Sequence, residues 1–224
     1  MTIDEVRVHQ GSTMRTVWRA SFAMLSVAGT IVGTEAALTS AASATTTAGT
    51  SASCPSRALG TPFTKWDDSN KYFLVPNGGF ENGTTGWSLS AGAAVTSGNE
   101  PYLVSGPGTH DLIVPNGGQA QSQPMCVARN EDSIRLFVYN RGVNGSILHV
   151  EAEVQNPQTG ATAQTAFDVN GNASPLGWSP TMVLGIPDLL SGNGTQLLTL
   201  IFTTRGAAAT WNIDDVYVDP FISR

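Results

Sequence analysis

Apolar residues recur at every second position along most of the chain beyond residue 70. The stretch 146–155 shows the pattern, with Leu148, Val150, Ala152 and Val154 in one phase and His149, Glu151 and Glu153 in the other. Successive side chains of a β-strand point to opposite faces, so this spacing predicts strands with one face buried. The same reasoning gives candidate strands at 71–76, 86–90, 93–97, 110–115, 124–128, 134–141, 146–155, 161–169, 180–184, 195–205 and 209–219.

Asn-Gly pairs separate many of these stretches, beginning at Asn77, Asn82, Asn116, Asn144, Asn170 and Asn193. Each pair supplies the positive φ angles that tight turns need. Charged residues make up only 12% of the chain, which argues against long amphipathic helices. Roughly ten short antiparallel strands favour an all-β fold, a two-sheet antiparallel β-sandwich of the jelly-roll type.

The N-terminal residues resemble an export signal. Arg15 and Arg19 precede an apolar run at 20–32, and the small residues 42–44 suit a signal peptidase. We therefore expect a signal peptide at 1–44, with Met14 a candidate start, and a secreted, extracellular protein without a transmembrane segment. A retained amphipathic helix is the alternative. The composition, rich in Ala, Gly and Thr and poor in Lys, is typical of bacteria with high genomic GC content.

A disordered linker is expected at 45–53, because its small polar residues bury little apolar surface. The rest, 54–224, is expected to form one β-sandwich domain with an N-terminal arm at 54–70. The only two cysteines, Cys54 and Cys126, are predicted to form a disulfide in an oxidising compartment. Two cysteines are too few for a common four-ligand zinc site.

Charge and motifs limit the function. The net charge of −6 argues against nucleic acid as a partner. Only His110 and His149 follow the signal segment, and no G-x-S-x-G or H-E-x-x-H motif occurs. We therefore predict that the chain is not an enzyme, and in particular not a glycoside hydrolase.

Both ends of the domain carry a recognisable pattern. Residues 77–83 (NGGFENG), followed by Gly86-Trp87, resemble the opening of the carbohydrate-binding-module-like, galactose-binding-like jelly rolls. Residues 211–218 (WNIDDVYV) resemble their last strand. The resemblance implies that the first and last strands are neighbours, and that Glu81 and Asp214 join a structural Ca²⁺ with a carbonyl from Asn77 or Gly79.

The alternation itself slips at Asp214-Asp215, which predicts a β-bulge. Two adjacent carboxylates would gain from a cation, and oxygen ligands suit Ca²⁺. Alternatively, both carboxylates face water at a sheet edge.

Residues 134–155 are interpreted as a hairpin with one aromatic and charged face. That face would carry Arg135, Phe137, Tyr139, His149 and Glu151, which suits stacking on a sugar ring and hydrogen bonds to its hydroxyls. The alternative is cross-strand Arg–Glu pairing with the rings packed against loops. Trp66, Trp87, Trp178 and Trp211 are interpreted as core or rim anchors.

Two functions remain on this basis. The first is a secreted non-catalytic module that recognises a polysaccharide, a cell-surface glycan or a cell-wall glycan. The second is a cell-envelope structural or protein-interaction module on the same scaffold.

Overall fold

The computed structural model of the chain describes residues 53–171, 177–190 and 194–220. The expected signal peptide (1–44) and the expected linker, apart from Ser53, lie outside these ranges. Within them the regular structure is β-strand, apart from one short 3-10 helix, η1 (Thr64–Trp66). None of the described residues belongs to a helix long and apolar enough to cross a membrane.

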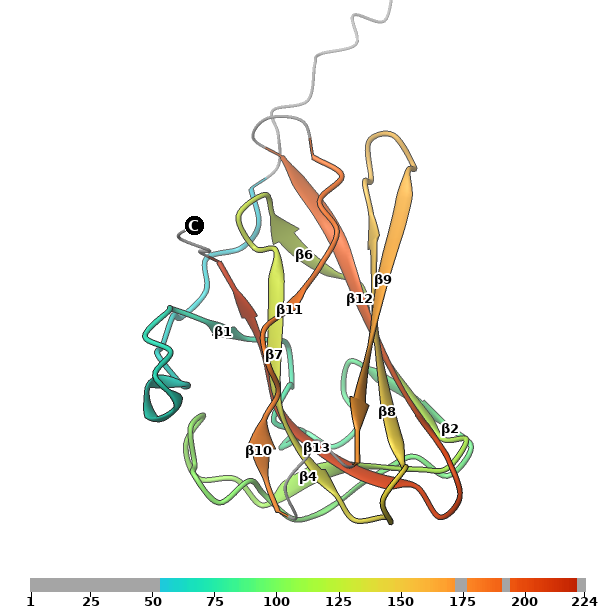
Figure 1. The fold of residues 1–224 in the computed structure, drawn as a ribbon. Helices are drawn as coiled ribbons and strands as arrows, with labels where there is room; N and C mark the ends of the chain where they lie inside the picture. The colour runs from blue at the N-terminus through green and yellow to red at the C-terminus, as the bar shows by residue number, and fades with distance from the viewer. Residues whose placement is uncertain (1–52, 172–176, 191–193, 221–224) are drawn as a thin grey trace, which may run out of the picture. The chain divides into compact units, whose positions relative to one another are not determined.

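The strands form two antiparallel sheets (Figure 1). The seven-stranded sheet has the order β10-β7-β13-β4-β3, with β1 also paired to β13 and β11 to β7. Its strands are β1 (Phe73–Leu74), β3 (Ala94–Ser97), β4 (His110–Pro115), β7 (Ser133–Asn140), β10 (Ser179–Pro180), β11 (Leu184–Gly185) and β13 (Thr210–Asp219).

The six-stranded sheet has the order β2-β5-β12-β8-β9, with β6 also paired to β12. Its strands are β2 (Trp87–Ser90), β5 (Gln119–Ser122), β6 (Met125–Ala128), β8 (Ile147–Gln155), β9 (Thr162–Asn170) and β12 (Thr195–Arg205). The prediction of an all-β, two-sheet sandwich is confirmed.

The hydrophobic core lies between the sheets and follows the period-two pattern. Leu148 and Val150 of β8 are fully buried, in one cluster with Leu112 and Val114 of β4. Trp87 and Trp211 belong to the same cluster, as expected for core anchors.

The two ends of the domain lie side by side. Phe73 of β1 pairs with Val218 of β13, which confirms that the first and last strands are neighbours. The pairing of β13 with β7 shifts between Asp214 and Tyr217, so the predicted bulge is present. Asp215 has a φ of 47°, a left-handed conformation that suits such a bulge.

The N-terminal arm is fastened to the domain by a disulfide and by aromatic packing. A disulfide joins Cys54 to Cys126 of β6, 72 residues further along, as predicted. Farther along the arm, Phe63 is buried against the outer face of the seven-stranded sheet, with its ring stacked 5.4 Å from that of Phe137.

The prediction of a hairpin over 134–155 is wrong. Strands β7 and β8 follow one another in sequence, but β7 pairs with β13 whereas β8 pairs with β12 and β9. The turn at Asn144-Gly145 exists, with Gly145 at a φ of 87°, and it connects the two sheets. Period-two spacing identifies the buried face of a strand but not the sheet to which the strand belongs.

Candidate functional site

The predicted ligand-binding residues lie on two different surfaces. Arg135, Phe137 and Tyr139 belong to β7 and point to the outer side of the seven-stranded sheet, whereas His149 and Glu151 lie on β8 in the other sheet. The five residues therefore do not form one site.

The aromatic side of β7 is covered by the chain itself. Phe137 is 0% exposed, with Trp66 of the arm 5.2 Å and Tyr102 5.8 Å from its ring. Tyr139 is half-buried and its ring lies 5.9 Å from that of Trp178. The rings of Phe137 and Tyr139 thus pack against the arm and loops. The alternative interpretation of the sequence, in which these rings do not bind sugar, predicted such packing.

Arg135 also contacts the N-terminal arm. Its Nη1 lies 2.6 Å from Asp68 Oδ2 of the arm, and its Nε donates to the Thr181 carbonyl at 2.7 Å. The guanidinium also lies 4.5 Å from the Phe63 ring centre. Arg135 therefore holds the arm in place, and its acidic partner is Asp68 of the arm.

The outer face of the six-stranded sheet has a different character. The buried residues of β8 alternate with His149, Glu151 and Glu153, which point outward as the sequence predicts. The strand register sets outward side chains opposite one another in three rows across the sheet. The first row is Ser90, Gln119, Thr203, His149 and Asp168, and the second is Ser88, Gln121, Ile201, Glu151 and Ala166. The third is Thr199, Glu153 and Gln164. We call these thirteen residues the polar face.

The centre of the polar face has unused hydrogen-bonding groups. Among the described residues, no hydrogen bond or ion pair engages the side chains of Gln121, Glu151 or Glu153. Ile201 lies between Gln121 and Glu151 and supplies a half-buried apolar patch. A hollow of about 100 Å³ adjoins the polar face at Glu153 and Thr199. Its lining is completed by Pro124, Gln155 and Leu197.

One corner of the polar face is tied up by charge pairing. His149 Nδ1 lies 2.7 Å from Asp168 Oδ1, and Arg205 forms an ion pair with the same carboxylate. The hydrogen bond from His149 and the charge of Arg205 lower the pKa of Asp168. This trio fixes the end of the face nearest to the β9 edge.

The residues expected to bind calcium have separate roles. The Asn77 side chain is engaged within its own loop, donating to the carbonyls of Gly83 and Thr85 and accepting from the Asn82 N–H. The ligand that the family resemblance implies at Asn77 is its backbone carbonyl, not this side chain. Its backbone carbonyl accepts from Trp87 Nε1 at 3.2 Å.

Glu81 accepts hydrogen bonds from backbone amides at the start of β4. Its Oε1 accepts from the N–H groups of Thr109 and His110 at 2.8 and 2.9 Å. Although partial burial acts in the opposite direction, these amides lower the pKa of Glu81. Its carboxylate is thus ionised and fixed near the start of β4.

Asp214 is different because it is fully buried among other acids. Its Oδ2 accepts from the Glu100 N–H and its Oδ1 from the Asp215 N–H, while Glu100 and Asp215 are also buried. Burial raises the pKa of Asp214 to about 8 and that of Asp215 to about 6. The interpretation in which both carboxylates face water is wrong.

This acidic cluster offers oxygen donors, but no finished metal site. In the ranges that the structure covers, no three His, Cys, Asp or Glu side chains are placed to hold an ion. Gly79 passes close by, since a Cβ there would lie 3.0 Å from Asp215 Oδ1. The Gly79 segment and Asp214 therefore lie close together, as ligands of one cation would have to.

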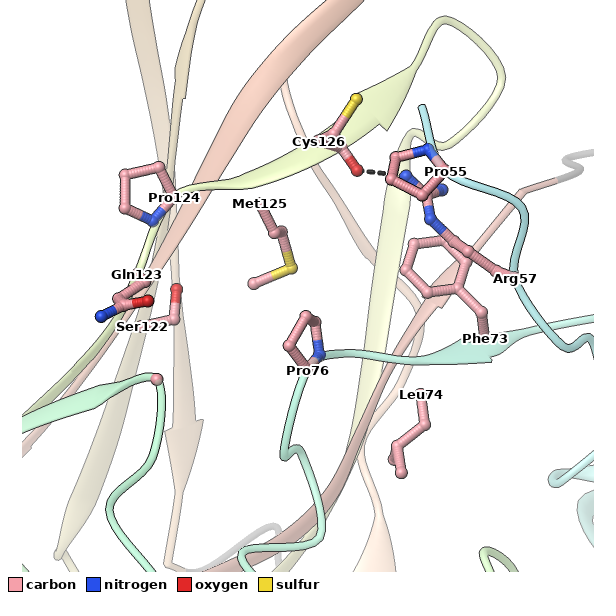
Figure 2. Close-up of a pocket in the computed structure, with 11 residues that line it drawn as sticks. Pro55, Arg57, Phe73, Leu74, Pro76, Ser122, Gln123, Pro124, Met125 and Cys126 are labelled. Atoms are coloured by element: carbon pink, nitrogen blue, oxygen red, sulfur yellow. Dashed lines mark hydrogen bonds between the residues drawn. The ribbon is translucent and has the colours of Figure 1, made fainter. Parts of the chain in front are cut away.

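A separate pocket lies between β1 and β6 (Figure 2). It has a volume of about 310 Å³ and is lined by Pro55, Arg57, Phe73, Leu74, Pro76, Gly86, Ser122, Gln123, Pro124, Met125 and Cys126. Arg57 lies 4.1 Å over the Phe73 ring and donates to the Cys126 carbonyl and to Glu131. The cation of this mainly apolar pocket is therefore engaged within the chain.

Known proteins resemble this chain in structure and not in sequence. No protein-family model and no curated protein matches the sequence. Similar solved structures include TmCBM61 in complex with β-1,4-galactotriose, at 19% identity and a TM-score of 0.39 over 65% of this chain and 96% of that one. A family 16 carbohydrate-binding module has 19% identity and a TM-score of 0.42 over 64% and 96% of the two chains.

The family 11 carbohydrate-binding module from Clostridium thermocellum, in complex with a β-1,3-1,4-mixed-linked tetrasaccharide, has 13% identity and a TM-score of 0.38 over 68% and 98% of the chains. These structural neighbours are carbohydrate-binding modules, the class that the sequence motifs resemble.

Sequence reasoning missed part of the polar face. Gln119 and Gln121 lie on β5, a strand that was not predicted because its four residues, QAQS, include only one apolar side chain. Its pairing partners, β2 and β12, were both predicted. The Asn-Gly turn at Asn116, directly before β5, was the available signal.

Proposed function

We propose that this chain is an exported, non-catalytic module that binds a polysaccharide or cell-surface glycan on its polar face. The observation that carries the proposal is the group of unengaged polar side chains at the centre of that face, with Glu151 and Gln121 on either side of Ile201. The motif resemblance and the sandwich fold support the same class.

The chemistry of the face suits sugar hydroxyls. A carboxylate accepts hydrogen bonds, whereas a side-chain amide both donates and accepts them. Glu151 can therefore accept from a sugar hydroxyl, and Gln121 can either donate to one or accept from it. Neighbouring strands lie ~4.8 Å apart, which spaces these groups evenly across the sheet. None of the thirteen residues of the polar face is Phe, Tyr or Trp, so binding would rest on hydrogen bonds and on contact with Ile201.

Export is part of the proposal. The basic and apolar residues ahead of position 44 support it, as does the disulfide between Cys54 and Cys126, because such bonds persist in oxidising compartments. Detection of a processed form in the culture medium, with an N-terminus near Thr45, would test it, and a chain retained unprocessed inside the cell would contradict it.

The experiment for glycan binding is a glycan array followed by affinity electrophoresis in polysaccharide gels. The variant Glu151→Ala is expected to lose most of the retardation, and Gln121→Ala part of it. Arg141→Ala, which is exposed at the end of β7 in the other sheet, serves as the matched control and is expected to bind normally. Equal retardation of all three variants would contradict the proposed face.

A second function has one observation in its favour. Phe137 is buried, so the aromatic surface that the sequence suggested for sugar stacking is closed. This favours a structural or protein-interaction module for that side of the molecule. If the unmodified protein gives no saturable signal on the glycan array, glycan binding is contradicted and the structural or protein-interaction function is favoured.

Calcium is the third part of the proposal. Asp214 would supply a carboxylate, Glu81 a second from the neighbouring loop, and the Gly79 segment a carbonyl, as the family resemblance implies. The buried, acid-only cluster around Asp214 supports it, and the backbone carbonyl of Asn77 is the alternative to that of Gly79. Thermal unfolding with and without Ca²⁺ tests it, and equal melting temperatures would contradict it.

A further inference from the structure

The free edge of β9 is the longest unpaired edge that the described residues present. Strand β9 (Thr162–Asn170) is the last strand of the six-stranded sheet, and in the described part of the chain it pairs only with β8 (Figure 1). Proteins commonly protect such edges with Lys, Pro, bulges or short length. Strand β9 has nine residues, TAQTAFDVN, without Lys, Pro or a bulge, and its one charged side chain, Asp168, is paired with His149 and Arg205 of its own chain.

The pairing with β8 determines which backbone groups face outward. The Asn156 N–H donates to the Ala161 carbonyl and the Gly171 N–H to the Ser146 carbonyl, at the two ends of the ladder. In an antiparallel pair, hydrogen-bonded positions alternate along the strand. The odd-numbered residues of β9 therefore bond to β8, and the free N–H and C=O groups belong to Thr162, Gln164, Ala166, Asp168 and Asn170.

The sequence of β9 is complementary to itself about Ala166. An antiparallel pair centred there sets Ala166 opposite its own copy, Gln164 opposite Asp168 of the second copy and Thr162 opposite Asn170 of the second copy. No like charges meet, and the small central side chains allow close approach. The outward-facing residues would exchange about ten backbone hydrogen bonds in this register.

The inner side of β9 also gains from such a pairing. Phe167 and Val169 are only half-buried and line a groove of about 290 Å³ together with Val138, Pro180 and Leu184 of the opposite sheet. Met182, which also lines the groove, is 76% exposed. In the proposed register Phe167 lies opposite Thr165 of the second copy, so the apolar side chains at both edges lose contact with water.

We propose that β9 is a self-association edge, through which two copies of this chain join their six-stranded sheets into one continuous antiparallel sheet. The occupant is a second copy because the register centred on Ala166 satisfies the free backbone groups and pairs Gln with Asp. The inference does not depend on glycan binding.

Sedimentation velocity of the full chain over a range of concentrations tests the association. The unmodified protein is expected to form a dimer. Ala166→Lys is expected to raise the dimer dissociation constant about tenfold or more, because it sets two ammonium groups directly opposite each other. Ala166 is exposed in the single chain, so circular dichroism should show an intact fold.

The matched control is Ser97→Lys, an exposed position on β3, the edge strand of the other sheet. It is expected to leave the dimer unchanged. A monomer at all concentrations would overturn the proposal, as would a dimer that Ala166→Lys leaves intact.

Cysteine cross-linking tests the register separately. Opposed residues in a hydrogen-bonded antiparallel pair have Cα atoms ~5.5 Å apart, within the range of a disulfide. Ala166→Cys is expected to give a covalent dimer on mild oxidation, which reductant reverses. Gln164→Cys lies four residues out of register with its own copy and is expected to stay monomeric in denaturing gels. Equal cross-linking of both variants would overturn the register.

Discussion

The backbone N–H of Glu100 donates a 2.9 Å hydrogen bond to Oδ2 of Asp214, which lies 114 residues further along the chain. This bond ties the loop before β4 to the bulge of β13. Next to it, the Ser105 N–H donates to Asp215 at 3.2 Å. Two adjacent buried carboxyls are thus held by backbone amides.

We predict that the stability of the cation-free protein falls as the pH rises from about 4 to about 8. Burial raises the pKa of Asp214 from 3.8 to about 8 and that of Asp215 to about 6. Across this window the folded chain binds more protons than the unfolded chain, so the free energy of unfolding decreases with pH. Urea unfolding in EDTA at several pH values measures it.

The variant Asp214→Asn is expected to flatten this dependence, because it replaces the titrating group with a neutral one of similar shape. Asp67→Asn is the control, since Asp67 is exposed and already occupies a left-handed conformation that Asn tolerates. A stability that rises with pH over the same window would show that Asp214 is ionised in the folded protein.

Arg135→Ala is expected to destabilise the fold by about 3 kcal/mol, because it leaves Asp68 without its cation in a largely buried position. The comparison is Arg129→Ala, because the ion pair of Arg129 with Asp188 is 3.9 Å long and exposed. This variant is expected to lower the free energy of unfolding by less than about 0.5 kcal/mol. Chemical denaturation measures both. Equal effects would mean that the arm is not held by Arg135.

Removal of the disulfide by the double change Cys54→Ala and Cys126→Ala is expected to cost about 3 to 5 kcal/mol, because the bond closes a long loop in the unfolded chain. Thermal unfolding of the variant beside the oxidised protein measures the loss. Identical melting curves would indicate that the arm contributes nothing to the stability of the sandwich.

Added Ca²⁺ is expected to raise the melting temperature of the unmodified protein, since a ligand that binds only the folded state stabilises it. The response should disappear in Asp214→Asn and in EDTA, and Mg²⁺ should act more weakly because it requires a smaller, octahedral site. A melting temperature that is the same in Ca²⁺ and in EDTA would contradict the proposed calcium site.

The sequence predicts most of the strands because period-two alternation directly reports a half-buried strand. Two predicted ranges, 110–115 and 195–205, match β4 and β12 residue for residue. The bulge at Asp214-Asp215 was also visible, since a slip in phase is itself a pattern. Strand β5 was missed because a short polar strand at the surface leaves almost no apolar signal.

The arrangement of strands into sheets was not predictable in the same way. The turn at Asn144-Gly145 has the composition of a hairpin turn, yet it joins strands in different sheets, and this separates Phe137 from His149. Burial of Phe137 comes from Phe63 and Trp66, more than 70 residues away in sequence. Contacts over such separations leave no local pattern for alternation to report.

The central claim is that the outer face of the six-stranded sheet binds glycan. It is tested most directly by NMR, titrating the isotope-labelled protein with an oligosaccharide selected on the array. Saturable shifts of amide signals are expected around Gln121, Glu151 and Ile201, with the signals of β7 unchanged. Shifts confined to β7 and the arm, or none at saturating sugar, would contradict it.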